Sequence, residues 1–297
     1  MPIPSEPRKD LSNTYVVQGD LYAEELHRLT IQDELATTLM GGPLSEQSGA
    51  ASIRRVLDIG SGSGSWVLSA AKTYPEMSLI GIDISQRMVD YARQQTSDLQ
   101  LTERVEFHVM NALLMLEFPD DYFDLVNLRF GIGYLRTWDW PKLLGDMLRV
   151  CRPGGIVRVT ECEVGGQSSS QAVTQLYSLL TTALFREGHL FEQNPRGLID
   201  HLVPLLTRHG IQQVQARTYV STPPPGSPEV QAGAQDIIGL CSVSRPFLEK
   251  WDCLPADYDA FCQQVIAEVQ NPAFTSSATL LTVWGNKPDA PLTGRGM

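Results

Sequence analysis

The sequence has few basic residues, few cysteines and no long apolar run. Its 297 residues include 23 Lys and Arg against 34 Asp and Glu, which gives a formal net charge of −11. Proteins that bind nucleic acid usually carry an excess of positive charge, so duplex DNA and tRNA are disfavoured as substrates. We therefore expect a small-molecule substrate and no nucleic-acid partner.

The five cysteines form no Cys-x-x-Cys pair and are odd in number. This usage is typical of reduced thiols, and it lacks the paired spacing of zinc sites. No apolar run approaches the roughly 20 residues that a membrane span needs, and the N-terminus has no apolar stretch typical of a secretory signal. We expect a cytoplasmic protein with no metal and no membrane partner, either a monomer or a homodimer.

From Arg54 onward, apolar strands alternate with helical patterns. The expected strands are 54–59, 78–84, 105–110, 123–130, 155–161, 211–222 and 278–287. Helices are expected at 65–74, 86–95 and 140–151, and Ser85 is placed to cap the second of these. Strands that alternate with helices predict a parallel sheet with helices on both faces.

Two further regions lie outside this alternation. Residues 22–42 have the periodicity of an amphipathic helix that ends at a Gly-Gly pair, and we assign 1–50 to an N-terminal cap segment. Helices are also expected at 168–188, 196–210 and over much of 229–270. We expect one domain, with a core of 51–165, 206–222 and 276–288. Residues 166–205 and 229–270 then form a helical lid over the carboxyl ends of the strands, where open α/β sheets bind ligands.

The turn after the first strand is rich in glycine. It reads Gly60-x-Gly62-x-Gly64 between a buried strand and a helix. Glycines in such a turn permit positive φ and let the backbone approach a ligand closely. A dinucleotide-binding turn has the spacing G-x-G-x-x-G, so the third glycine here comes one residue early. No Gly-Lys-Ser/Thr follows the turn, which excludes a P-loop.

Two carboxylates flank this turn. Asp83 ends the second strand, where a carboxylate accepts hydrogen bonds from the ribose hydroxyls of an adenosine cofactor. NAD enzymes share that feature. Asp58 lies inside the first strand, where a dinucleotide fold usually has an apolar residue. Its carboxylate can anchor the glycine turn or bind an amino group through water, which favours a cofactor other than NAD.

Four segments together resemble the sequence motifs of the class I S-adenosylmethionine-dependent methyltransferases, close to the small-molecule, ubiquinone-biosynthesis-like branch. They are VLDIGSGSG, GIDIS, FDLVNLRF and LRVCRPGGIVRVTE, in that family's order and spacing, between roughly Arg54 and Glu161. The resemblance implies an α/β, Rossmann-like fold. Its seven strands would run in the order 3-2-1-4-5-7-6, with strand 7 antiparallel, helices on both faces and a helical lid.

The same resemblance implies S-adenosyl-L-methionine as the cofactor and S-adenosyl-L-homocysteine as its product. The residues that it places around the methionine part are Asp58, Gly60, Ser61, Gly62 and Gly64. Asp83 would hold the ribose, and Ile84 and Met88 would flank the adenine. After the third strand the family usually has Asp-Ala, whereas this chain has Asn111-Ala112. Asn111 keeps a carbonyl acceptor for the adenine amine, but a neutral acceptor binds more weakly than a carboxylate.

The fourth strand ends in Asn127-Leu128-Arg129-Phe130. Family members that methylate DNA or protein amides carry Asn/Asp-Pro-Pro-Tyr/Phe there, so that substrate class is disfavoured. We expect Asn127, Arg129 and Phe130 at the cofactor, because a charged residue at a strand end needs a partner. Either the cofactor carboxylate or a neighbouring acidic residue can serve as the partner of Arg129.

Other candidates come from the helices and from the fifth strand. In similar small-molecule methyltransferases the N-terminal helix closes over the cofactor, so Tyr15, Arg28 and Gln32 are cofactor candidates. The catalytic candidates are His189, in the break between two lid helices, Glu161, at the end of the fifth strand, and Arg129. A general base is needed only if the nucleophile arrives protonated.

We therefore predict an enzyme that methylates a small, hydrophobic or aromatic molecule on oxygen, nitrogen or carbon. An NAD(P)-dependent oxidoreductase is one alternative. The glycine spacing and Asp58 disfavour it, as does the missing Tyr-x-x-x-Lys pair. A protein of this fold that binds the cofactor without transferring a methyl group is another. The sequence does not separate this binding protein from an active methyltransferase, because methyltransferases share no invariant catalytic residue.

Overall fold

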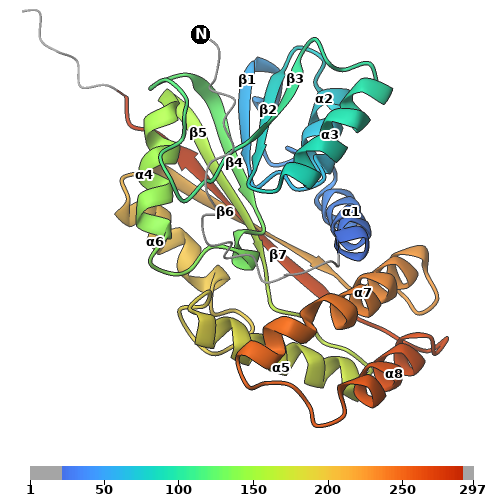
Figure 1. Ribbon diagram of the computed structural model, residues 1–297. Coiled ribbons are helices and arrows are strands. Elements are labelled where there is room, and N and C mark those ends of the chain that lie inside the picture. The colour runs from blue at the N-terminus through green and yellow to red at the C-terminus, as the bar shows by residue number, and fades with distance from the viewer. Residues whose placement is uncertain (1–21, 290–297) are drawn as a thin grey trace, which may run out of the picture.

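A computed structural model describes residues 22–289, and its centre is one seven-stranded sheet (Figure 1). The strands are β1 (Arg55–Ile59), β2 (Ser78–Asp83), β3 (Val105–Val109), β4 (Phe123–Arg129), β5 (Cys151–Cys162), β6 (Gln212–Ser221) and β7 (Ala278–Asn286). Their order is β3-β2-β1-β4-β5-β7-β6, and β7 is antiparallel to both of its neighbours. The fold and strand order expected from the sequence are thereby confirmed.

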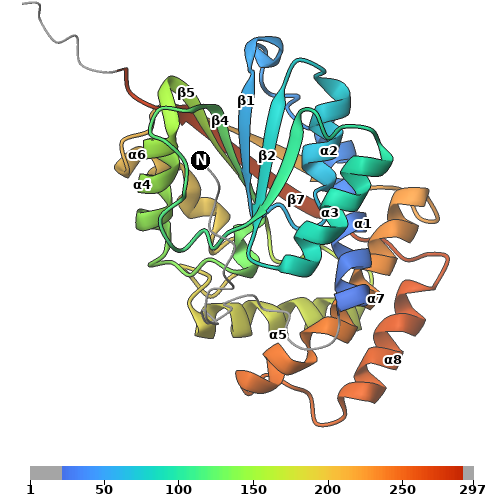
Figure 2. The same cartoon turned by 45° about the horizontal axis from the view of Figure 1, so that its top comes forward.

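Helices cover both faces of the sheet, as Figures 1 and 2 show. One face carries α1 (Tyr22–Met40), α2 (Ser65–Thr73) and α3 (Gln86–Asp98), and the other carries α4 (Trp140–Val150) and α6 (Leu202–Arg208). Apolar side chains of α2 and α3 pack on β1, β2 and β3, and those of α4 and α6 join a larger core on the opposite face. Burial of these side chains is the main driving force for the layered arrangement.

Three helices form the lid beyond one end of the sheet. These are α5 (Gln171–Glu187), α7 (Pro228–Lys250) and α8 (Tyr258–Val269), which contact one another in pairs (Figure 2). Helix α7 also packs along α1, which connects the lid to the N-terminal helix. The lid is thus continuous with the core, and we retain the single-domain division as a proposal.

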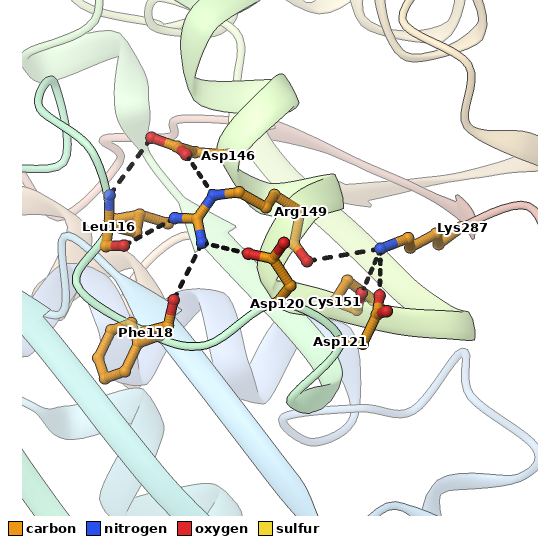
Figure 3. Close-up of polar contacts among 8 residues, drawn as sticks. All are labelled: Leu116, Phe118, Asp120, Asp121, Asp146, Arg149, Cys151 and Lys287. Atoms are coloured by element: carbon orange, nitrogen blue, oxygen red, sulfur yellow. Dashed lines mark hydrogen bonds and ion pairs between the residues drawn. The ribbon is translucent and has the colours of Figure 1, made fainter.

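A polar cluster joins the segment between β3 and β4 to the end of α4, the start of β5 and the residue after β7 (Figure 3). The guanidinium of Arg149, at the end of α4, donates to the carboxylates of Asp146 and Asp120 and to the backbone oxygens of Leu116 and Phe118. Lys287, just after β7, donates to the carboxylate of Asp121 and to the backbone oxygens of Arg149 and Cys151. Two cations thus fix the long β3–β4 connection.

The helix expected at 196–210 is shorter than the prediction. A 3₁₀ turn at Ile199–His201 leads into α6, which begins at Leu202. Pro204 explains this start, because proline lacks the amide hydrogen that an interior helical residue donates and is tolerated only in a first turn.

No helix within residues 22–289 is both long and apolar enough to cross a membrane.

Candidate functional site

The glycine turn needs glycine at three alternate positions. Gly60, Gly62 and Gly64 have φ of +67°, +50° and +79°, in the left-handed region that L side chains rarely adopt. Gly64 is also tightly packed, because a Cβ there would lie 2.6 Å from Cζ of Phe107. These conformations explain the spacing G-x-G-x-G, and the three glycines place no Cβ atoms at alternate positions of the turn before α2.

Asp83 holds this turn against the end of β2. Its carboxylate accepts hydrogen bonds from the backbone N–H of Gly62 at 2.9 Å and from that of Ser85 at 2.8 Å. Burial raises the pKa of the Asp83 carboxyl above its usual range, and these backbone hydrogen bonds oppose the rise. Each carboxylate oxygen has a further lone pair, so Asp83 can hold the glycine turn and accept ligand hydroxyls together.

The residues expected around adenine follow β2 and β3. Ser85 accepts from the N–H of Met88 at 3.4 Å, which confirms it as the cap of α3. Met88 is buried, whereas Ile84 is 39% exposed, an unusual exposure for a large apolar side chain. The side-chain oxygen of Asn111 accepts from the N–H of Leu113 at 2.8 Å. This bond orients Asn111 and uses one of the two lone pairs of that oxygen.

A row of buried polar side chains crosses the sheet beside the glycine turn. Asp58, Asn127 and Arg158 are register partners on β1, β4 and β5. The Asn127 amide donates to Asp58 at 2.7 Å, and its oxygen accepts from Arg158 at 2.6 Å. Arg158 in turn donates to Glu46, at 2.6 Å, in an ion pair that is almost fully buried. Burial raises the pKa of Asp58 to about 7, although the hydrogen bond from Asn127 opposes the rise.

Arg129 ends β4 on the same face of the sheet. One terminal nitrogen of its guanidinium donates to the Thr37 hydroxyl at 3.1 Å and lies 3.3 Å from the Asp33 carboxylate, both on α1. The Nε atom and the second terminal nitrogen are buried without a hydrogen-bond partner among the described residues. Burial lowers the pKa of Arg129, yet an arginine stays protonated in proteins. Two buried donors of a charged group therefore face a position that an anionic group would satisfy.

Phe130 changes the direction of the chain immediately after Arg129. Its backbone is left-handed, with φ of +56° and ψ of +40°, which is uncommon for a bulky residue and marks local strain. A 3₁₀ turn at Gly131–Gly133 follows, and the Glu161 carboxylate accepts from the N–H of Ile132 at 3.2 Å. Glu161 is fully buried, and burial raises its pKa to about 8. Glu161 thus fixes the segment that carries Phe130.

A cavity of about 770 Å³ lies between the lid and the core. Its wall consists mainly of apolar side chains from α1, α5 and α7, the ends of β5 and β7, and the segment 130–133. A volume of this size suits a drug-sized ligand. Phe130 and Ile132 line this cavity. Arg129 is the residue immediately before Phe130 in the chain. We call the glycine turn, Asp58, Asp83 and Arg129 the strand-end site. The cavity and the strand-end site therefore meet at one short segment.

The remaining predicted residues lie in different places. Arg28 and Gln32 line the lid cavity, and Arg28 is engaged by Glu25 and Asp236. His189 is fully buried, its Nδ1 lies 2.8 Å from the Leu135 carbonyl, and it does not line the cavity. The Ser61 hydroxyl is buried, and the half-buried Ala112 follows Asn111. Tyr15 falls outside the described residues.

Sequence reasoning missed the partners of this site. Asp33, Thr37 and Glu46 come from α1 and from the loop after it, where nothing in the local pattern marks them as buried. Arg158 gave a usable signal, because a charged residue within an otherwise apolar strand requires a buried partner. Asp236 and Tyr177 line the cavity from lid helices whose sequence pattern indicates an amphipathic helix and does not indicate a cavity.

Comparisons with known proteins agree with this geometry. Residues 56–155 match the family model described as a methyltransferase domain. A demethylmenaquinone methyltransferase of Deinococcus radiodurans is 34% identical over 128 residues, which are 43% of this chain and 51% of the relative. A ubiquinone/menaquinone biosynthesis C-methyltransferase of Geobacter sulfurreducens is 31% identical over 140 residues, 47% of this chain and 53% of the relative. The chain thus spans about half the length of these curated relatives.

Solved structures show the same fold at low sequence identity. Phosphoethanolamine N-methyltransferase 2 of Haemonchus contortus, in complex with phosphomonomethylethanolamine and S-adenosylhomocysteine, has a TM-score of 0.52 and 18% identity. That match covers 92% of this chain and 59% of the other. The YcgJ protein of Bacillus subtilis has a TM-score of 0.50 and 18% identity, over 87% of this chain and all of the other. Residues 56–155 are thus similar to methyltransferase domains, in agreement with the resemblance of the sequence motifs to the class I S-adenosylmethionine-dependent methyltransferases.

Proposed function

We propose that this protein transfers a methyl group from S-adenosylmethionine to a small, largely apolar molecule. The observation that carries the proposal is the segment from Arg129 to Gly133. Arg129 presents unpaired buried donors at the strand-end site, and Phe130 and Ile132 line a cavity of about 770 Å³. A cofactor at the first site and an acceptor in the second would meet at this segment. Relatives named for quinone methylation support a small-molecule acceptor.

The residues of the strand-end site fit the groups of this cofactor. The two unpaired guanidinium donors of Arg129 suit its carboxylate, since arginine binds a carboxylate through two parallel hydrogen bonds. Asp58 offers a carboxylate to its amino group. Asp83 accepts from the ribose hydroxyls, and the side chains of Ile84 and Met88 flank the adenine. The Asn111 oxygen takes the adenine amine.

The bound cofactor supplies a methyl group already activated by a positively charged sulfur. The work of the protein is then to orient the acceptor toward that methyl group and to exclude water, and orientation alone can contribute several kcal/mol. For Glu161 and His189 we propose positioning roles. Glu161 holds the turn that follows Phe130, and His189 holds the backbone at Leu135. Glu161 therefore acts through the segment from Arg129 to Gly133, and His189 acts through the chain just after it.

Calorimetric titration of the full chain with S-adenosylmethionine, S-adenosylhomocysteine and NAD tests the cofactor. We expect the first two to bind and NAD not to bind. Binding of NAD without binding of S-adenosylmethionine or S-adenosylhomocysteine would contradict this proposal and indicate an oxidoreductase. Release of S-adenosylhomocysteine with a panel of phenols, amines and enolisable ketones then tests transfer. Cofactor binding without release from any acceptor would favour a binding protein that keeps the fold.

A matched pair of ligands tests the role of Arg129. 5′-Methylthioadenosine carries the adenosine of the cofactor but no amino-acid carboxylate. We expect Arg129→Lys, which keeps the charge but loses the planar fork, to weaken S-adenosylhomocysteine by about tenfold and to leave methylthioadenosine unchanged. Equal weakening of both ligands would show that Arg129 supports the fold of the site and does not bind the carboxylate.

A further inference from the structure

We infer that the lid cavity binds a lipophilic amine, and that the Asp236 carboxylate is the counter-ion of its ammonium group. This rests on the proposed function, because the cavity is taken as the acceptor site, and it adds the chemical class of the acceptor. The inference concerns recognition of the ligand.

Asp236 lies on α7 and lines the cavity with its side chain 22% exposed. One carboxylate oxygen accepts from a terminal nitrogen of Arg28 at 3.2 Å. The other oxygen has no hydrogen bond or ion pair within residues 22–289. Burial raises the pKa of the Asp236 carboxyl, and Arg28 opposes the rise. A second cationic donor at the other oxygen would pair with this carboxylate and offset the cost of its desolvation.

Arg28 is not available to an anionic ligand. Its Nε and one terminal nitrogen donate to the two oxygens of Glu25, both at 2.7 Å, and its other terminal nitrogen donates to Asp236. Among the described lining residues Arg28 is the only Lys or Arg. The acidic lining residues are Glu34, Glu163, Glu229 and Asp236. A phosphate or carboxylate on the acceptor would therefore meet like charges and find no free cation, which disfavours phosphorylated and acidic acceptors.

Aromatic rings complete the surroundings of Asp236. Tyr177 of α5, Phe247 of α7 and Phe130 line the same cavity. Burial raises the pKa of the Tyr177 hydroxyl, and the charge of Asp236, which lines the same cavity, adds to the rise. A cation that approaches a carboxylate gains a further attraction from aromatic faces. Leucine, isoleucine, valine and alanine side chains make up much of the remaining wall and suit the apolar body of the ligand.

Three probes with one skeleton test the inference in the full chain. They are 4-phenylbutylamine, 4-phenylbutan-1-ol and 4-phenylbutyric acid, titrated calorimetrically at neutral pH with and without S-adenosylhomocysteine. We expect the amine to bind at least about tenfold more tightly than the alcohol, and the acid to bind most weakly. Asp236→Asn should remove the preference for the amine and leave the affinity for the alcohol within about twofold.

Two further variants separate recognition from structural support. Asp236→Glu keeps the charge and should keep the amine preference. Glu249→Gln removes a carboxylate from an exposed position of the same helix, outside the cavity, and should change nothing. If Asp236 only joined α7 to α1, Asp236→Asn would weaken amine and alcohol alike, and the inference would be wrong.

The same titrations distinguish this inference from the proposed function. Binding of S-adenosylhomocysteine without an amine preference, or with none of the probes bound at millimolar concentration, overturns the inference alone. An amine preference that disappears in Asp236→Asn, in a chain that does not bind S-adenosylhomocysteine, supports the inference and overturns the proposed function.

Discussion

Asn127 donates its side-chain amide to Asp58 across the β1–β4 pair at 2.7 Å. The amide oxygen of Asn127 accepts from Arg158 at 2.6 Å, so one neutral side chain joins a buried carboxylate to a buried guanidinium. Asp58 comes two residues before the glycine turn, and Arg158 is paired with Glu46. The row therefore holds the carboxyl end of β1 in a fixed position relative to β4 and β5.

Asn127→Ala should destabilise the protein by about 2–5 kcal/mol, because it leaves a buried carboxylate and a buried guanidinium each without one partner. Urea unfolding at neutral pH measures this change. Gln215→Ala is the control, since Gln215 is the exposed member of the same register row, on β6, and its loss should cost less than about 0.5 kcal/mol. Similar losses in the two variants would contradict a structural role for the row.

Gly64→Ala tests the packing of the glycine turn separately from its conformation. A Cβ at Gly64 would lie 2.6 Å from Phe107 and 2.9 Å from Ala92, whereas a Cβ at Gly226 would meet nothing within 4 Å. Both glycines have similar φ, +79° and +76°, so both alanine variants carry the same left-handed strain of about 1 kcal/mol. Gly64→Ala should lose about 1–3 kcal/mol more than Gly226→Ala in thermal or urea unfolding. Equal losses would mean that the turn relaxes without cost.

Glu161→Gln should make the stability of the protein less dependent on pH. The pKa of Glu161 is raised by burial to about 8 in the folded chain, above its ordinary value of 4.5. The folded state therefore binds the proton more tightly than the unfolded state does. The stability that this contributes is fully present below about pH 4.5 and is lost as the pH rises toward 8. Glutamine cannot ionise, and its side-chain oxygen can still accept from Ile132.

Unfolding free energies at pH 5 and pH 9 measure this effect. Between pH 5 and pH 9, the unfolding free energy of wild type should fall by on the order of 2–4 kcal/mol more than that of Glu161→Gln. Glu76→Gln, at an exposed position, should show the same pH dependence of the unfolding free energy as wild type. A Glu161→Gln curve that also runs parallel to wild type would show that Glu161 does not carry the raised pKa.

The sequence predicts the sheet well because its signals are local. Apolar strands, the glycine turn and Asp83 each have a short pattern, and the family resemblance supplied the strand order. The helix predicted at 196–210 begins only at Leu202, because Pro204 is tolerated in a first turn and not in a helix interior. Such errors affect the ends of an element and leave its place in the fold unchanged.

The partners within the site are harder to predict, because they join segments distant in sequence. Arg158 and Glu46 are separated by 112 positions, and Arg28 and Asp236 by 208. No periodicity in one segment identifies a partner in another. The lid cavity has the same origin, since its wall combines α1, α5, α7 and strand ends. The donor of the proposed reaction could therefore be inferred from sequence, whereas the character of the acceptor required the packing of the lid.

The most direct test of the account is the affinity of S-adenosylhomocysteine for wild type and for Asp83→Ala. We predict measurable binding to wild type and a loss of about 1–3 kcal/mol in the variant, the cost of unpairing hydrogen bonds to a charged group. Asp98→Ala, at an exposed carboxylate on the last residue of α3, should bind like wild type. No binding to wild type, or equal affinity in a folded Asp83→Ala variant, would contradict the account.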